Sequence, residues 1–247
     1  MQKITIIAGK NKKNELEDFE EITLCRGEIC SIVGNTGSGK SRLIKDIEQL
    51  ATGDSITGRT VLVDGNKIEK TRKRDISSSL IAHLSQNMRF VLDTTIEEFL
   101  LLHGKARNKK VPVQAVIDIA NTITPEPISP QQSLNLLSGG QSRALMVADI
   151  ALICDSEIVL VDEIENAGID KERALNALVG EDKLVLVVTH DPHTALMASK
   201  RIVMKGGGVK AVIEKTADEE KLFEKLRINY YANQSYQKML REGAILK

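Results

Sequence analysis

The 247-residue sequence predicts an α/β fold with a parallel-sheet core, an antiparallel β element near the N-terminus and an inserted α-helical subdomain. Three continuously apolar, β-branched runs (29–33, 158–161 and 184–188) are typical of strands that are buried on both faces of a parallel sheet. Only 3% of the residues are aromatic and Trp is absent, so the core must consist of Ile, Leu, Val and Ala. A sheet wrapped by helices supplies such a core.

The remaining elements follow from alternation and helical periodicity. Short strands are predicted over 3–7 and 60–64, with Asp64 and Gly65 as a turn, and these form the antiparallel element. Helices are predicted over 42–50, 96–102, 113–122 and 142–154.

The chain is interpreted as one domain with three parts. The mostly helical stretch 90–142 interrupts the alternation of strands and helices, and Pro125, Pro127 and Pro130 break it up. We interpret it as the helical subdomain, with the core over 1–89 and 143–213. The highly charged stretch 214–247 is expected to be a C-terminal helical appendage.

Composition excludes several classes of protein. Lys and Arg together number 34, as do Asp and Glu, so the net charge of zero offers no bulk field for nucleic acid, and no direct nucleic-acid partner is expected. No apolar run approaches the roughly 18 residues of a membrane span. Cys25, Cys30 and Cys154 form no CxxC pair, which favours buried thiols in a reducing compartment over zinc or disulfides.

Each of the three apolar runs ends in a polar cluster: residues 34–41, residues 162–163 and residues 189–191. Ligands of open α/β sheets bind beyond the carboxyl ends of the strands. The three clusters therefore predict one site.

The first cluster has the pattern G-x-x-x-x-G-K-S between a predicted strand and a predicted helix, which indicates a phosphate-binding loop of the P-loop NTPase type. Its backbone N–H groups surround a phosphate, Lys40 reaches the β- and γ-phosphates, and the Ser41 hydroxyl ligates Mg²⁺. A glycine-rich turn that binds no phosphate is the alternative. The predicted nucleotide-binding residues of this loop are Gly34, Asn35, Thr36, Gly37, Ser38, Gly39, Lys40 and Ser41.

The second cluster places two carboxylates after a buried strand. Asp162 is the expected Mg²⁺ ligand and Glu163 the base that polarises the attacking water. Many strands simply end in solvated acidic residues, so the pair alone is a weak signal. The phosphate-binding loop upstream makes the catalytic interpretation more favourable.

The third element is the run Leu137-Ser-Gly-Gly-Gln141, which is the signature motif of the ATP-binding cassette (ABC) ATPase family. The chain resembles this family over nearly all of its length, from about residue 3 to residue 212. The resemblance implies that Ser138, Gly139, Gly140 and Gln141 bind the nucleotide held by another copy.

The resemblance extends to three further positions. Gln86 resembles the Q-loop residue that ligates Mg²⁺ or the water, and His190 resembles the switch histidine that contacts the γ-phosphate, although a lone His is more often a cap or core residue. Asp170 resembles the D-loop residue that crosses the dimer interface, and the resemblance implies that it also belongs to the nucleotide-binding residues. The implied catalytic residues are Lys40, Gln86, Glu163 and His190, the implied metal ligands are Ser41, Gln86 and Asp162, and the implied cofactors are ATP and Mg²⁺.

By family analogy, two copies, or this chain and a related ATPase, pack head to tail around ATP. Three roles share this machinery. The first is the ATP-binding subunit of an ABC transporter, cytoplasmic and held at the inner face of the membrane by a permease. The second is a soluble ABC ATPase that remodels a protein or assists cofactor loading. The third, a chromosome or repair ATPase, fits badly because the stretch between Lys40 and Ser138 leaves no room for long coiled coils.

The chain departs from the family in two places. The stretch after Glu163 is one residue longer than the usual D-loop. No aromatic residue stands near Lys13, where the family usually stacks the adenine, so we expect weak purine selectivity or stacking by a Lys or Arg stem. The basic run 67–74 is interpreted as a solvated loop, and the glycines 206–208 as a hairpin turn.

Overall fold

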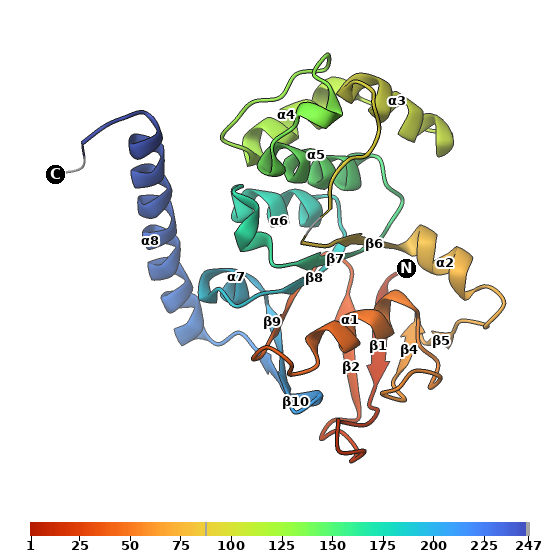
Figure 1. Cartoon of the computed structure of the whole chain (residues 1–247). Coiled ribbons are helices and arrows are strands. Elements are labelled where there is room, and N and C mark those ends of the chain that lie inside the picture. The colour runs from red at the N-terminus through yellow and green to blue at the C-terminus, as the bar shows by residue number, and fades with distance from the viewer. Residues whose placement is uncertain (87, 246–247) are drawn as a thin grey trace.

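The computed structural model describes residues 1–86 and 88–245, except for the side chains of residues 166 and 167. Two sheets form the frame of the molecule (Figure 1). The antiparallel sheet has the strand order β2-β1-β4-β5, with β1 (Lys3–Ile7), β2 (Glu21–Cys25), β4 (Thr60–Val63) and β5 (Asn66–Lys67). The second sheet has the order β10-β9-β3-β8-β7-β6, with β3 (Ile29–Val33), β6 (Ile81–Leu84), β7 (Ile158–Asp162), β8 (Leu184–Val188), β9 (Lys200–Lys205) and β10 (Gly208–Glu214).

The second sheet is parallel from β9 to β6, and β10 pairs with β9 as an antiparallel edge strand. The helices are α1 (Lys40–Glu48), α2 (Lys73–Leu80), α3 (Ile96–Ala106), α4 (Val113–Ile123), α5 (Gly139–Leu152), α6 (Lys171–Gly180), α7 (Pro192–Met197) and α8 (Ala217–Arg241). This architecture confirms the predicted α/β fold, with its parallel-sheet core, its antiparallel element and its helical insertion.

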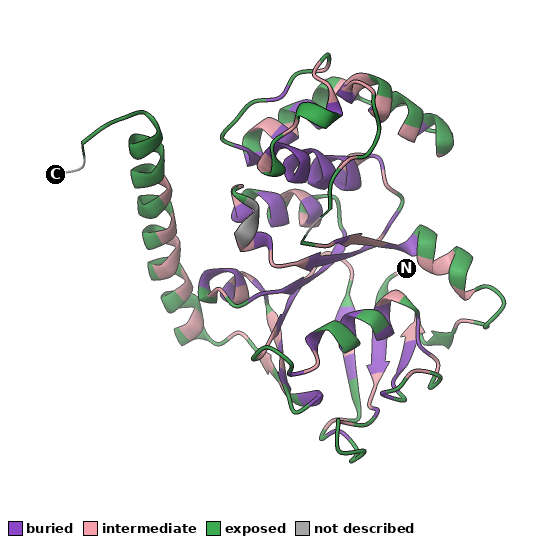
Figure 2. Ribbon diagram, viewed as in Figure 1, coloured by how far each residue is buried: buried purple, intermediate pink, exposed green. Residues whose placement is uncertain are grey.

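The apolar runs are continuous because β7 and β8 bury both of their faces. Val159 and Val161 of β7 lie in one hydrophobic cluster with the side chains of α5, while Ile158 and Leu160 lie in a second cluster with α1 and the antiparallel sheet. Figure 2 shows buried residues along these central strands and along α5. Since successive strand residues point to opposite faces, a strand between two cores has no position left for a polar side chain.

The helical subdomain contains α3 and α4 at the top of Figure 1, with α5 beneath them. Both α3 and α5 begin with a capping box, made by Thr95 with Glu98 and by Ser138 with Gln141. The predicted boundary between residues 142 and 143, where the subdomain was expected to end, falls inside the continuous helix α5. The division of the chain into core, subdomain and appendage stays a prediction.

The structure differs from the sequence prediction at several elements. The periodicity analysis missed the strands β2, β5, β6, β9 and β10 and the helices α2, α6 and α7. In β2, for example, only two of five residues are buried, so its apolar pattern is weak. α1 and α5 begin two and three residues before their predicted starts. The basic run 67–74 is largely exposed, as expected, but it ends inside α2 rather than in a loop.

Two smaller predictions concern the hairpin turns and the cysteines. Asp64 and Gly65 form the turn between β4 and β5, and residues 206–207 form the turn between β9 and β10, as predicted. The prediction of buried thiols holds only for Cys30, since Cys154 is half-buried and Cys25 is exposed. Cys25 is the last residue of the edge strand β2, where the alternation points its side chain to solvent.

The C-terminal helix α8 stands away from the body of the protein (Figure 1) and has no buried residue. Its inner side contacts α7, where the ring of Phe223 stacks on that of His193. No helix in the described part of the chain is both long enough and apolar enough to span a bilayer.

Candidate functional site

The loop between β3 and α1 forms a backbone cradle. Gly34, Gly37 and Gly39 have φ angles of 150°, 76° and 109°, which side chains rarely permit. A Cβ on Gly34 would lie 2.4 Å from the carbonyl oxygen of Met204 and 2.7 Å from Ser38 Oγ. The Ser38 hydroxyl is buried and, among the described residues, finds no hydrogen-bond partner. The loop thus combines free backbone donors with an unsatisfied hydroxyl, as an anion-binding loop requires.

Lys40 is the first residue of α1, and its ammonium group is held inside the loop. Nζ donates to the carbonyl oxygens of Gly34 at 2.6 Å and Asn35 at 3.3 Å. The side chain is almost fully buried, and within the described part of the chain its acceptors are neutral carbonyls, so its charge is available to a phosphate.

One cavity of about 320 Å³ brings together residues 36–41 of the loop, the carboxylate pair and His190; Gly34, Asn35 and Gln86 are not among its lining residues. It is bounded by the loop, by the carboxyl ends of β7 and β8 and by the loop after β8. The residues that line it are Lys12, Thr36, Gly37, Ser38, Gly39, Lys40, Ser41, Arg42, Asp162, Glu163, Val188 and His190. The Ser41 hydroxyl and the Asp162 carboxylate are hard oxygen donors that suit Mg²⁺.

Glu163 contacts both Gln86 and His190 of the cluster that follows β8. Gln86 Nε2 donates to Glu163 Oε2 at 2.9 Å, and His190 Nε2 lies 3.9 Å from Glu163 Oε1. The backbone of Glu163 adopts φ 46°, an unusual conformation for a side chain of this size, and its N–H donates to the Val188 carbonyl. Gln86 and His190 therefore meet at the carboxylate that the sequence predicts to be the base.

Two residues that the sequence analysis missed hold this arrangement. The buried Arg143 of α5 donates to the carbonyl oxygens of Ser85, at 2.5 Å, and Asp162, at 2.8 Å, and so fastens the ends of β6 and β7 together. Burial lowers the pKa of its guanidinium, and the Asp162 charge opposes this shift. Arg143 stands two positions after the signature motif, where helical periodicity alone gives it no special meaning.

Glu165 is the second missed residue. Its Oε1 accepts hydrogen bonds from Thr189 Oγ1 at 2.9 Å and from the His190 backbone N–H at 3.0 Å. The loop that carries Glu163 is thereby fastened to the loop that carries His190. In the sequence, the acidic residue two positions after Glu163 was the available signal.

The signature residues lie outside the cavity. Ser138 caps α5, and its hydroxyl also donates to Glu126 Oε2 at 3.0 Å. Gly139 is exposed and Gly140 half-exposed at the start of the helix, whereas Gln141 is buried. Within the described residues, one chain supplies only one side of the site that the family resemblance implies.

Asp170 also lies outside the cavity. Its Oδ1 caps α6 by accepting from the backbone N–H groups of Glu172 and Arg173, each at 3.1 Å. The Tyr230 hydroxyl of α8 donates to the same oxygen at 3.3 Å. The segment that resembles a D-loop is therefore in contact with the C-terminal helix.

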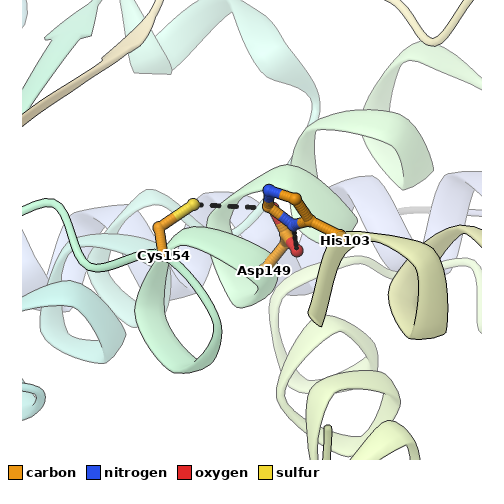
Figure 3. A group of neighbouring side chains, drawn as sticks. All are labelled: His103, Asp149 and Cys154. Atoms are coloured by element: carbon orange, nitrogen blue, oxygen red, sulfur yellow. Dashed lines mark hydrogen bonds and ion pairs between the residues drawn. The ribbon is translucent and has the colours of Figure 1, made fainter. Parts of the chain in front are cut away.

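A second group of polar side chains, His103, Asp149 and Cys154, lies between α3 and the end of α5 (Figure 3). His103 Nδ1 is 2.6 Å from Asp149 Oδ1, and Cys154 Sγ lies 3.8 Å from Asp149 Oδ2. Burial, together with the Asp149 charge, raises the pKa of the Cys154 thiol to about 11. The thiol therefore stays protonated, and both oxygens of the Asp149 carboxylate are engaged. We interpret the group as a contact that joins α3 to α5.

Comparison with known proteins agrees with the motif pattern. A family model described as ABC transporter matches residues 20–166. An uncharacterised ABC transporter ATP-binding protein of Methanocaldococcus jannaschii is 52% identical over 228 residues, covering 92% of this chain and 87% of that protein.

Two solved structures share the fold. The first is cbiO1 from Clostridium perfringens, part of the ABC transporter complex cbiONQ, with a TM-score of 0.64, 19% identity and coverage of 97% of this chain and 98% of that one. The second is a dimeric, post-hydrolysis ATP-binding cassette bound to ADP and Pi, with a TM-score of 0.62, 24% identity and coverage of 85% and 98%.

Proposed function

The chain belongs to the ABC transporter family of ATP-binding proteins, and from this premise we propose that it hydrolyses Mg-ATP as a head-to-tail dimer. The observation that carries the proposal is a cavity that gathers the phosphate loop, Asp162, Glu163 and His190, while Ser138, Gly139 and Gly140 of the signature lie outside it and are at least partly exposed. A half-site of this kind is completed by the Ser138–Gln141 segment of a second copy.

Each residue then has a role. Lys40 and the loop N–H groups bind the β- and γ-phosphates, and Ser41, Asp162 and Gln86 would hold Mg²⁺. When bound, the ion neutralises charge on the phosphates. Glu163 accepts the proton of the attacking water, and the hydrogen bond from Gln86 orients its carboxylate. His190, which lines the same cavity, contacts the γ-phosphate. The reaction converts ATP and water to ADP and phosphate.

The Glu163→Gln variant tests this mechanism. It keeps the shape of the side chain and its contact with Gln86 but removes the base, so turnover should fall by about 100-fold or more. ATP binding should persist, and the uncleaved nucleotide should hold the dimer in size-exclusion chromatography with light scattering. Glu214→Gln is a matched control, because Glu214 is an exposed residue at the end of β10. Near-normal turnover by Glu163→Gln would refute the assignment of the base.

We infer further that the chain is the ATP-binding subunit of a transporter, located at the cytoplasmic face of a membrane through a permease. An apolar surface supports this role. Met88, Val91 and Leu92 follow Gln86, and Val91 is 91% exposed. Exposed apolar side chains next to the site residue Gln86 are typical of a surface that binds a partner protein.

Affinity purification of the Glu163→Gln form with Mg-ATP, from membrane and soluble fractions separately, tests this role. An integral membrane protein that copurifies supports the transporter subunit. A soluble partner without a permease supports the alternative, an ATPase that remodels a protein or assists cofactor loading. A Lys40→Ala form, which loses the phosphate-binding cation, is the control for binding that does not depend on ATP.

A further inference from the structure

Lys12, which the sequence analysis did not select, reaches the phosphate loop from the N-terminal segment. Its Nζ donates to the Gly37 carbonyl oxygen at 2.5 Å, and its side chain lines the same cavity as Lys40. The sequence analysis placed Lys13 at the position where the family usually stacks the adenine. Lys13 is exposed and does not line the cavity.

The backbone around Lys12 is packed directly against the phosphate loop. The Lys12 N–H donates to the Gly206 carbonyl at 3.1 Å, and the Gly207 N–H donates to the Ser38 carbonyl at 2.8 Å. A Cβ on Gly207 would lie 2.3 Å from Lys12 Cγ, and a Cβ on Gly39 would lie 2.9 Å from Gly207 Cα. Gly207 of the β9–β10 turn is therefore sandwiched between Lys12 and the loop, with no space for a side chain.

A buried ion network fixes the segment that carries Lys12. Glu17, whose side chain is fully buried, accepts hydrogen bonds from the backbone N–H groups of Gly9 at 3.0 Å and Val209 at 2.6 Å. Arg59 pairs with Glu17 at 2.6 Å and with Asp46 of α1 at 3.0 Å. This network attaches the segment at once to β10 and to the helix that follows the phosphate loop.

The Lys12 ammonium is a cation without a counterion. No carboxylate lies within ion-pair distance of it among the described residues, and its one hydrogen-bond acceptor is a neutral carbonyl. An ammonium group has three donors, and a phosphate oxygen is a stronger acceptor than a carbonyl. The cavity that Lys12 lines also contains Lys40 and Arg42, so three cations surround the place where a polyphosphate would bind.

We propose that Lys12 is a triphosphate-binding residue of this site, and that the chain recognises its nucleotide by the polyphosphate rather than by the base. The proposal rests on the proposed ATPase function and goes beyond it. It accounts for the missing aromatic residue, since a cation on the phosphates supplies affinity that base stacking supplies elsewhere. It also predicts similar affinities for ATP and GTP.

Isothermal titration of the full chain with ATP, GTP and inorganic tripolyphosphate tests the proposal. Lys12→Met keeps the stem that packs on Gly207 and removes the charge. It should weaken binding of all three ligands by a similar factor of about tenfold, as expected for the loss of one charge-assisted hydrogen bond. Lys13→Met, the neighbouring control, should stay within about twofold of the wild type, and Lys12→Arg should restore most of the affinity.

Three outcomes would overturn the proposal. Unchanged affinities in Lys12→Met would make Lys12 only a structural contact of Gly37. Weakened binding of the nucleotides but not of tripolyphosphate would place Lys12 on the base or ribose. A wild type that binds neither ATP nor tripolyphosphate would refute the proposed function itself, and so is distinguishable from the first two.

Discussion

Replacing Arg59 with Met should cost about 3–5 kcal/mol of folding free energy, the usual cost of leaving one member of a buried ion pair without its partner. The Arg59 and Glu17 side chains are both 0% exposed, and their contacts include Arg59 Nε to Glu17 Oε2 at 2.8 Å. Burial alone would raise the pKa of Glu17, but hydrogen bonds from Arg59, Val209 and Gly9 outweigh it and hold the pKa below 4.5. The variant removes the strongest of these compensations.

For a chain of this size, about 1 kcal/mol corresponds to about 2–4 °C in Tm. Arg59→Met should therefore melt roughly 6–20 °C below the wild type in a circular-dichroism thermal scan, with a matching shift in a urea titration. The matched control is Arg26→Met. Arg26 pairs with Glu157 and Asp182 but is 35% exposed, so its loss should cost about 1 kcal/mol or less.

A double variant separates the charge effect from packing. Arg59→Met combined with Glu17→Gln leaves no unpaired charge at the Glu17 position, so it should recover part of the loss, and the cycle measures the coupling. If Arg59→Met is no more destabilising than Arg26→Met, the network does not hold the N-terminal segment, and the reasoning is refuted. Because folding lowers the pKa of Glu17, its contribution is present above pH 4.5 and is lost as the pH falls below that value.

Two further predictions concern the contact of Glu165 with the loop of His190 and the contact between α7 and α8. Glu165→Ala should lower kcat about tenfold in a phosphate-release assay, with ATP affinity nearly unchanged, because Glu165 orients the backbone of His190 without lining the cavity. Burial, together with the Lys171 and Arg227 charges, lowers the pKa of His193 from 6.5 to about 4. The wild type should therefore lose stability as the pH falls from about 6.5 to 4. In urea titrations, the stability of His193→Phe should depend less on pH over this range.

The controls for these two predictions are conservative changes. Glu165→Gln keeps an acceptor oxygen and should retain most of the activity; equal losses in Glu165→Gln and Glu165→Ala would count against a positioning role. His193→Phe keeps a ring that can stack on Phe223 and Tyr230. The same slope of stability against pH in the wild type and in His193→Phe would show that another group titrates there.

Much of the fold is encoded by short runs of neighbouring residues in the sequence. The strands β3, β7 and β8 bury both faces, so their apolar runs mark them directly, and each run ends where a polar site residue begins. The phosphate loop is likewise a short, continuous motif between a strand and a helix. The edge strands β2 and β10, and β9 beside β10, carry weaker apolar patterns, because several of their side chains are only partly buried or exposed.

The sequence by itself determined the α/β class, the phosphate loop, the carboxylate pair and the signature helix, because each is encoded by neighbouring residues. Only the tertiary structure decided that Lys12 reaches Gly37, that Arg143 joins β6 to β7 and that Glu165 fastens the loop of His190. These contacts join residues from separate parts of the chain. Their partners depend on how the two sheets and the helices pack, which no local periodicity specifies.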